Sequence, residues 1–145
     1  MNTDIIRSLN IRNRTEQCKQ VEKIFPEWKR ESSRLYDYRN QFNRKIELKI
    51  QSNRQWIDPC KFTNLNEEDK EIIMVFVFHK NGCIDLIAST YLKEFAKMLR
   101  LKKKFFQYCC YVKQLSPSAQ IKHPVEIRTL FKEYRNKFTI IWAGI

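Results

Sequence analysis

A run of apolar residues near the middle of the chain constrains the fold most strongly. From Ile72 to Phe78 the sequence reads IIMVFVF. A segment that is apolar on both faces predicts a strand covered on both sides, which places it at the centre of a sheet. The Asn81-Gly82 pair that follows is typical of a tight hairpin turn. We therefore expect a return strand over Cys83–Ala88.

A second strand is predicted over Lys45–Gln51, where polar and apolar residues alternate strictly. The apolar positions fall on one face of such a strand and the polar positions on the other. Asn40 and Asn43 suit a turn before this strand. The preceding segment, Leu35–Tyr38, is therefore expected to pair with it as an antiparallel hairpin. An ordinary half-buried strand would show the same alternation.

The register of this hairpin decides which side chains meet. We expect Asp37 opposite Glu47, a register whose other pairs are Tyr38 with Ile46, Tyr36 with Leu48, and Leu35 with Lys49. Opposed residues share a face of the sheet. This register gathers Asp37, Glu47 and Lys49 and leaves aromatic residues beside the aliphatic ones, whereas a shift by one residue would mix the two faces.

Such a cluster has a definite chemistry. Two neighbouring carboxylates are stable as ions only beside a cation, and oxygen ligands of this kind suit Mg²⁺, which completes its shell with water and substrate phosphate. A lysine beside the metal, here Lys49, can orient a water or help to deprotonate it, and can stabilise the charge of the transition state. Asp37 and Glu47 are therefore the expected metal ligands.

The charge of the chain indicates a polyanionic partner. Among 145 residues, 28 are Lys or Arg and 16 are Asp or Glu, which gives a net charge of +12. Such an excess points most simply to nucleic acid. A genome that favours Lys, Asn and Ile codons is the alternative explanation of this charge.

Length and cysteine usage set the remaining limits. The length suits one domain, residues 1–145. The five cysteines are odd in number and none has C-x-x-C spacing, which favours reduced thiols in a cytoplasmic protein over zinc or disulfides. No apolar run has the length of a signal or membrane-spanning segment, so we expect no membrane association.

The chain is expected to divide into three regions: a helical segment over about 3–25, a catalytic sheet over about 33–88, and a helix and strand region over about 90–145. In the last region we expect a helix over Tyr91–Leu101 capped by Ser89 or Thr90, a loop over Ser116–Pro124, a helix over Val125–Tyr134 and a strand over Phe138–Trp142. The predicted fold class is α/β, with a mixed, mainly antiparallel central sheet flanked by helices.

Polar and basic residues outside the hairpin are candidates for contacts with nucleic acid. They form three groups along the chain, namely Asn53, Arg54 and Gln55, then Arg100, Lys102 and Lys103, and finally Lys122 and His123. Asn and Gln can bind adenine, Arg can bind guanine, and all can bind phosphate. A polar loop, or cations at a helix C-terminus, would have the same composition. Glu31 and Gln51 are secondary candidates for the catalytic site.

The spacing of Asp37 and Glu47-Leu48-Lys49 resembles the PD-(D/E)xK nucleases, the restriction-endonuclease-like superfamily. The order of helix, acidic strand, E-x-K strand, central strand and helix is similar to the core of that family, and the ten-residue spacing is similar to small type II enzymes of the PvuII type. Tyr36 stands where the name of the family has proline. The resemblance implies one or two Mg²⁺ ions, with Mn²⁺ as a substitute, bound by Asp37, Glu47 and the carbonyl of Leu48, and Lys49 as the catalytic lysine.

Together these features predict a Mg²⁺-dependent DNA endonuclease, most simply a homodimeric type II restriction endonuclease with a restriction-endonuclease-like fold. A junction-resolving or repair nuclease would share the same core. The alternative from another class is a non-catalytic protein, either a basic nucleic-acid-binding protein or a phage or host inhibitor. In such a protein Glu47 and Lys49 would be cross-strand salt-bridge partners on a solvated face.

Overall fold

The apolar run at the middle of the chain forms the central strand, as predicted. In the computed structural model this strand, β5, spans Ile73–Lys80. Five consecutive residues of it, Met74–Phe78, are all buried. It pairs with β3 on one side and with β6 on the other. The structure describes residues 16, 18–31, 36–51, 54–57, 65–80, 83–102, 107, 111 and 123–144, with the backbone alone at 51, 54–57, 123 and 124.

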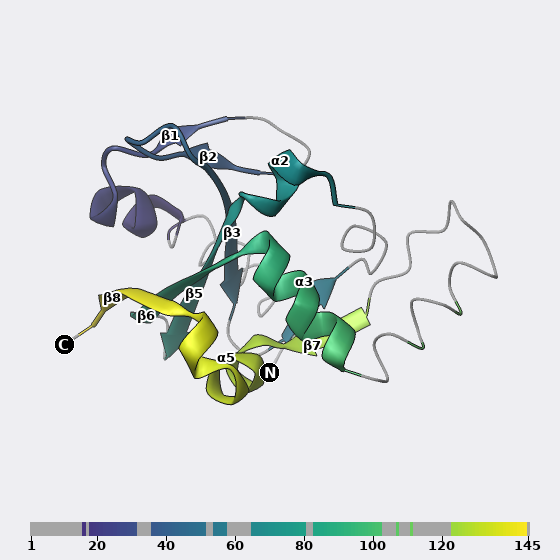
Figure 1. Cartoon of the computed structure of the whole chain (residues 1–145). Coiled ribbons are helices and arrows are strands. Elements are labelled where there is room, and N and C mark those ends of the chain that lie inside the picture. Colours follow the sequence, from purple (N-terminus) through teal and green to yellow (C-terminus); the bar gives the residue numbers. More distant parts are fainter. Residues whose placement is uncertain are drawn as a thin grey trace.

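The main sheet has six strands in the order β1-β2-β3-β5-β6-β8 (Figure 1). Besides β5, its strands are β1 (Lys29–Arg30), β2 (Tyr38–Arg39), β3 (Lys45–Gln51), β6 (Cys83–Tyr91) and β8 (Thr139–Ala143). Strands β3 and β5 run parallel, and every other neighbouring pair is antiparallel. The prediction of a mixed, mainly antiparallel sheet is confirmed.

Helices cover both faces of this sheet. Figure 1 shows α3 (Leu92–Leu101) on one side of the sheet and the helix at residues 18–24 on the other. The alternation of β5 explains this arrangement, because successive side chains of a strand point to opposite faces. Met74, Phe76 and Phe78 pack in one cluster with α3 and α5 (Ile127–Glu133), whereas Val75 and Val77 pack in another with Val21. An α/β architecture with flanking helices is therefore confirmed.

A second, two-stranded sheet pairs β4 (Arg54–Ile57) with β7 (His123–Glu126). The sequence predicted a loop through Pro124 and a helix from Val125, and both boundaries were wrong. The backbone at 123–126 is extended because it pairs with β4, so α5 begins only at Ile127.

The start of α3 also differs from the prediction. Ser89 and Thr90 do not cap this helix because both lie in β6, where they pair with β5. The Thr90 hydroxyl instead donates to the carbonyl of Lys137, 2.9 Å away. The cap position is Tyr91, which makes no side-chain capping hydrogen bond. The predicted Asn81-Gly82 turn lies outside the described residues.

Two short helical segments complete the described elements. Helix α2 (Glu67–Lys70) begins at Asn66, whose side chain accepts a 2.7 Å hydrogen bond from the amide of Asp69. A turn of 3₁₀ helix, η2 (Arg135–Lys137), joins α5 to β8. Among the described residues, no helix has both the length and the apolar character needed to cross a membrane.

Candidate active site

The hairpin of β2 and β3 has the predicted register. Tyr38 pairs with Ile46, and Arg39 pairs with Lys45. The turn between the strands is fixed by Asn40, whose side chain accepts hydrogen bonds of 3.0 Å from the amides of Phe42 and Arg44. Asn43 takes a positive φ of 60°, a conformation that asparagine tolerates better than most residues. The two asparagines therefore set which residues of the hairpin meet.

Asp37 lies immediately before the first residue of β2, where the chain bends, and it forms hydrogen bonds directly with β3. Its amide donates to the carbonyl of Ile46 at 2.8 Å, and its Oδ2 accepts from the amide of Leu48 at 2.9 Å. The carboxylate thus takes the place of the β2 backbone beside Leu48, the middle residue of Glu47-Leu48-Lys49. In a strand the amide and carbonyl of one residue point the same way, so the Leu48 carbonyl points to the side of Asp37.

Glu47 and Lys49 lie on one face of β3 and form an ion pair. Lys49 Nζ is 3.2 Å from Glu47 Oε1, and the two side chains are only 28% and 19% exposed. Their neighbours on β5 are Phe76 and Met74, so the pair borders the apolar cluster on the α3 side. The salt bridge of the non-catalytic alternative is therefore present, but it joins neighbours on one strand, and it is more shielded from solvent than a surface pair.

The predicted position of Tyr36 is wrong. Instead of facing Leu48 among aliphatic side chains, its hydroxyl donates to Glu31 Oε2 at 2.6 Å. The Nζ of Lys45 and the guanidinium of Arg39 lie 5.1 Å and 5.5 Å from the centre of its ring. The bend at Asp37 ends the strand alternation, so the register does not extend to Tyr36. Leu35, expected opposite Lys49, lies outside the described residues.

Glu31, the secondary acidic candidate, is engaged elsewhere in the hairpin. Its Oε1 accepts a 2.6 Å hydrogen bond from Arg39 Nε, and its Oε2 accepts from Tyr36. The hydrogen bond from Tyr36 and the neighbouring Arg39 guanidinium together lower the pKa of the Glu31 carboxyl group. Because both oxygens already accept hydrogen bonds, Glu31 fits a structural role better than that of a third metal ligand.

The structure brings some of the expected nucleic-acid contacts together. The backbones of Arg54 and Gln55 in β4 lie opposite Glu126 and Val125 of β7, and His123 lies opposite Ile57. The segments around Gln55 and His123 are therefore neighbours. Only the backbone is described for Arg54, Gln55 and His123, and for Gln51, which ends β3. Asn53, Lys103 and Lys122 lie outside the described residues.

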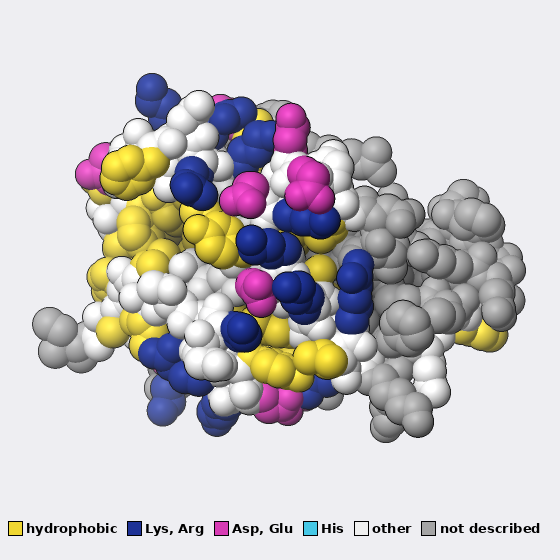
Figure 2. Space-filling model, viewed as in Figure 1, with side chains coloured by type: hydrophobic (Ala, Val, Ile, Leu, Met, Phe, Trp, Pro, Cys, Tyr) yellow, Lys and Arg dark blue, Asp and Glu magenta, His cyan; other side chains and the backbone are white. Residues whose placement is uncertain are grey.

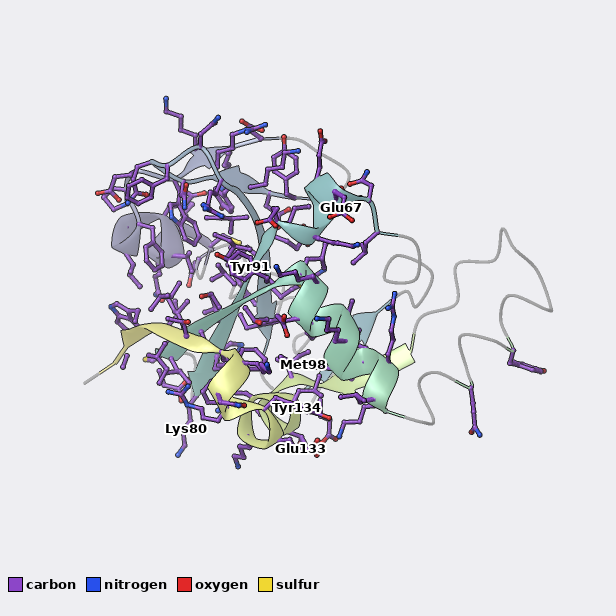
Figure 3. The ribbon with its side chains drawn as sticks, viewed as in Figure 1. Glu67, Lys80, Tyr91, Met98, Glu133 and Tyr134 are labelled. Carbon is purple, nitrogen blue, oxygen red and sulfur yellow. The ribbon has the colours of Figure 1, made fainter. Side chains whose placement is uncertain are left out.

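The remaining two expected contacts lie at the end of α3. Arg100 is exposed in the last turn of the helix, and Lys102 follows its end. Lys102 forms an ion pair with Glu133 of α5, a residue labelled in Figure 3. Lys102 thus has a local partner that links α3 to α5, which favours a structural role for it.

The oxygen donors near Leu48 are of the chemical kind that Mg²⁺ binds. Among the described residues, Asp37 Oδ1 makes no hydrogen bond, because the one hydrogen bond of this carboxylate is accepted by Oδ2. No group of three His, Cys, Asp or Glu side chains suited to a metal occurs in the described part of the chain. A Mg²⁺ site of two carboxylates and one carbonyl needs no third such side chain, because Mg²⁺ keeps several waters.

Sequence reasoning missed Arg39 and Lys45, which face each other across β2 and β3 on the side of Glu47. Both contact the Tyr36 ring. The signal that would reveal them is the hairpin register itself, extended one pair toward the turn.

No family model and no curated protein matches the sequence, so the assignment of this site depends on its own geometry.

Proposed function

We propose that the protein is a Mg²⁺-dependent DNA endonuclease with a restriction-endonuclease-like fold, most simply a type II restriction endonuclease of the PD-(D/E)xK superfamily. The observation that carries this proposal is the 2.9 Å hydrogen bond from the Leu48 amide to Asp37 Oδ2. It ties an aspartate to the middle of a Glu-x-Lys on the neighbouring strand. We propose that this aspartate, the Glu47 carboxylate, the Leu48 carbonyl and Lys49 together form one site.

Each residue has a role in phosphodiester hydrolysis. Asp37, Glu47 and the carbonyl of Leu48 would hold Mg²⁺, which supplies positive charge for the reacting phosphate and for the leaving oxygen. The Nζ of Lys49 orients the attacking water and stabilises the negative charge that develops on the phosphate oxygens. The water oxygen forms a new bond to phosphorus as an ester bond breaks, and the water gives up a proton while the leaving oxygen gains one.

The partial burial of Glu47 and Lys49 supports this assignment. Side chains that are 19% and 28% exposed interact in a lower effective dielectric than surface groups. The ammonium of Lys49 lies 3.2 Å from Glu47 Oε1 and offsets the negative charge of that carboxylate. The Lys49 ammonium is also close enough to the Glu47 carboxylate to contact a water bound at that carboxylate.

Cleavage of mixed plasmid DNA in Mg²⁺ tests the proposal. Asp37→Asn, Glu47→Gln and Lys49→Ala are each expected to abolish cleavage while leaving DNA binding in Ca²⁺ intact. Glu133→Gln and Lys97→Ala are matched controls on α5 and α3, where each residue pairs with a local partner, and both should cleave normally. Cleavage that survives all three site variants, or no cleavage of any DNA by the wild-type protein, would overturn the proposal.

The products divide the nuclease class further. Discrete fragments support a restriction endonuclease, whereas cleavage of branched DNA alone supports a junction-resolving or repair enzyme. A homodimer is proposed with the restriction activity, because a two-fold symmetric protein can cut both strands of a palindrome. Sedimentation analysis would test it. A cytoplasmic location remains a prediction.

The second candidate function is a non-catalytic nucleic-acid-binding or inhibitory protein, and the ion pair between Glu47 and Lys49 favours it. In that case the pair serves the sheet and no metal binds there. Asp37→Asn and Glu47→Gln would then leave every activity unchanged. Titration with Mn²⁺ would give the same result for the wild type and for both variants.

A further inference from the structure

Three cations lie in one line across neighbouring strands of the sheet. Lys29 of β1 is opposite Arg39 of β2, and Arg39 is opposite Lys45 of β3. Residues opposed in this way share a face, and strands are about 4.8 Å apart, so the line spans roughly 10 Å. We call Lys29, Arg39 and Lys45 the cation row. Figure 2 shows Lys and Arg side chains gathered over β1 and β2.

The cation row is poorly neutralised by its surroundings. Like charges directly opposite each other in a sheet repel and destabilise it. Glu31 forms an ion pair with Arg39, the middle member, and the Tyr36 ring contacts Arg39 and Lys45. Among the described residues, the exposed Lys29 makes no ion pair. Among the described residues, Arg39 is thus the member of the cation row that forms an ion pair, and its partner is Glu31.

The opposite face of the same two strands is arranged differently. There Arg30 is opposite Tyr38, and Glu22 from the helix at residues 18–24 bonds to both. The one cation on that face is thus balanced by a carboxylate brought from another element. The excess positive charge of β1 and β2 is confined to the face that also carries Glu47.

The cation row leads to the candidate active site. Lys45 precedes Glu47 by two residues on the same face of β3, a step of about 7 Å. Two nucleotides along one strand of B-DNA advance by about the same distance, at 3.4 Å each. The cation row runs across the strands and ends at Lys45. A chain of phosphates bound along the row would therefore come within about two nucleotides of Glu47 and would turn there along β3 to reach the candidate active site.

We propose that Lys29, Arg39 and Lys45 bind the phosphate backbone of a nucleic acid strand and present it to the site at Asp37 and Glu47. The inference rests on the proposed function, since it names the surface that holds the substrate of that site. Glu31 and Tyr36 position the Arg39 guanidinium in the row. The contact is to phosphates, so it contributes affinity and orientation without reading base sequence.

Salt dependence of DNA binding tests the cation row. Binding of a fluorescent DNA duplex is measured by anisotropy in Ca²⁺ over a series of salt concentrations, for the wild type and for the double variant Lys29→Gln, Lys45→Gln. Each lost phosphate contact lowers the slope of log affinity against log salt by about 0.9. We expect the double variant to lose about 1.8 from the slope and to bind at least tenfold more weakly at moderate salt.

The matched control is the double variant Lys23→Gln, Arg30→Gln, which removes the same charge. Arg30 is on β1 but on the opposite face, and Lys23 is exposed on the helix at 18–24. The control should keep the wild-type slope. Equal losses in the two double variants would show an effect of net charge alone and would overturn the proposal. The proposal would also be overturned if the Lys29→Gln, Lys45→Gln variant lost binding to anionic lipid vesicles while its DNA binding stayed unchanged.

This assay separates the inference from the proposed function. It needs no cleavage, so a protein without nuclease activity can still show the slope difference, and a nuclease can fail to show it. Thermal melting supplies an independent readout, because removal of like charges from the row should keep or raise the melting temperature of Lys29→Gln. A clear fall in that temperature would mean that Lys29 stabilises the sheet, which contradicts the proposed row.

Discussion

Asp37 has a structural role and a proposed catalytic role, and two substitutions separate them. The half-buried carboxylate accepts a 2.9 Å hydrogen bond from the Leu48 amide, which has no β2 backbone partner at that position. Hydrogen bonds to charged acceptors contribute about 1.5–3 kcal/mol. Asp37→Ala removes the acceptor, and at this degree of burial we expect the free energy of unfolding to fall by about 2 kcal/mol. Asp37→Asn keeps an oxygen acceptor and should cost about 1 kcal/mol or less.

The two roles are measured by two assays on the same proteins. Urea unfolding followed by circular dichroism gives the stability, and plasmid cleavage in Mg²⁺ gives the activity. We expect Asp37→Asn to be nearly as stable as the wild type yet inactive, because an amide is a poor ligand for Mg²⁺ compared with a carboxylate. Equal destabilisation by both substitutions would refute the hydrogen-bond argument, and full cleavage by Asp37→Asn would refute the metal-ligand argument.

Three further predictions concern the hairpin and the core. Burial and the hydrogen bond to Glu22 raise the pKa of Tyr38 from 10.0 to about 12, so stability present below pH 10 should be lost as the pH rises toward 12. Tyr38→Phe should remove that loss in a pH series of thermal melts. Phe76→Ala, at 0% exposure between Phe95 and Phe138, should lower the unfolding free energy by about 3–5 kcal/mol, whereas the 75% exposed Phe42 should tolerate alanine. Asn43→Val should cost about 1–2 kcal/mol at φ 60°, and Asn43→Gly much less; equal losses would contradict the backbone argument.

The central part of the fold follows from local sequence signals. The apolar run at 72–78 favours β5 because a strand covered on both faces buries the side chains of both its faces, as Met74–Phe78 are buried here. The strict alternation of 45–51 specifies β3, and Asn40 and Asn43 specify the turn that sets its register. These signals lie within a few residues of the structure they determine, which is why the pairing of Tyr38 with Ile46 could be predicted.

Other elements depend on distant partners and have weak local signals. Strand β1 has two residues, Lys29 and Arg30, both charged and exposed. It shows no hydrophobic period, so the sequence does not predict it. Strand β7 is extended because it pairs with β4, about seventy residues earlier in the chain. The cation row follows from β1, and without that strand the sequence does not place Lys29 beside Arg39.

The bend at Asp37 shows how the same hairpin serves both structure and site. A regular strand would have continued the ladder and placed Tyr36 against the aliphatic face, with the Leu48 amide bonded to backbone. Instead the chain turns, the Asp37 carboxylate bonds to that amide, and Tyr36 joins Glu31 and Arg39 on the charged side. The departure from regular pairing therefore puts a carboxylate beside the Leu48 amide and an aromatic ring beside two cations. Both features arise at the residue where the register ends.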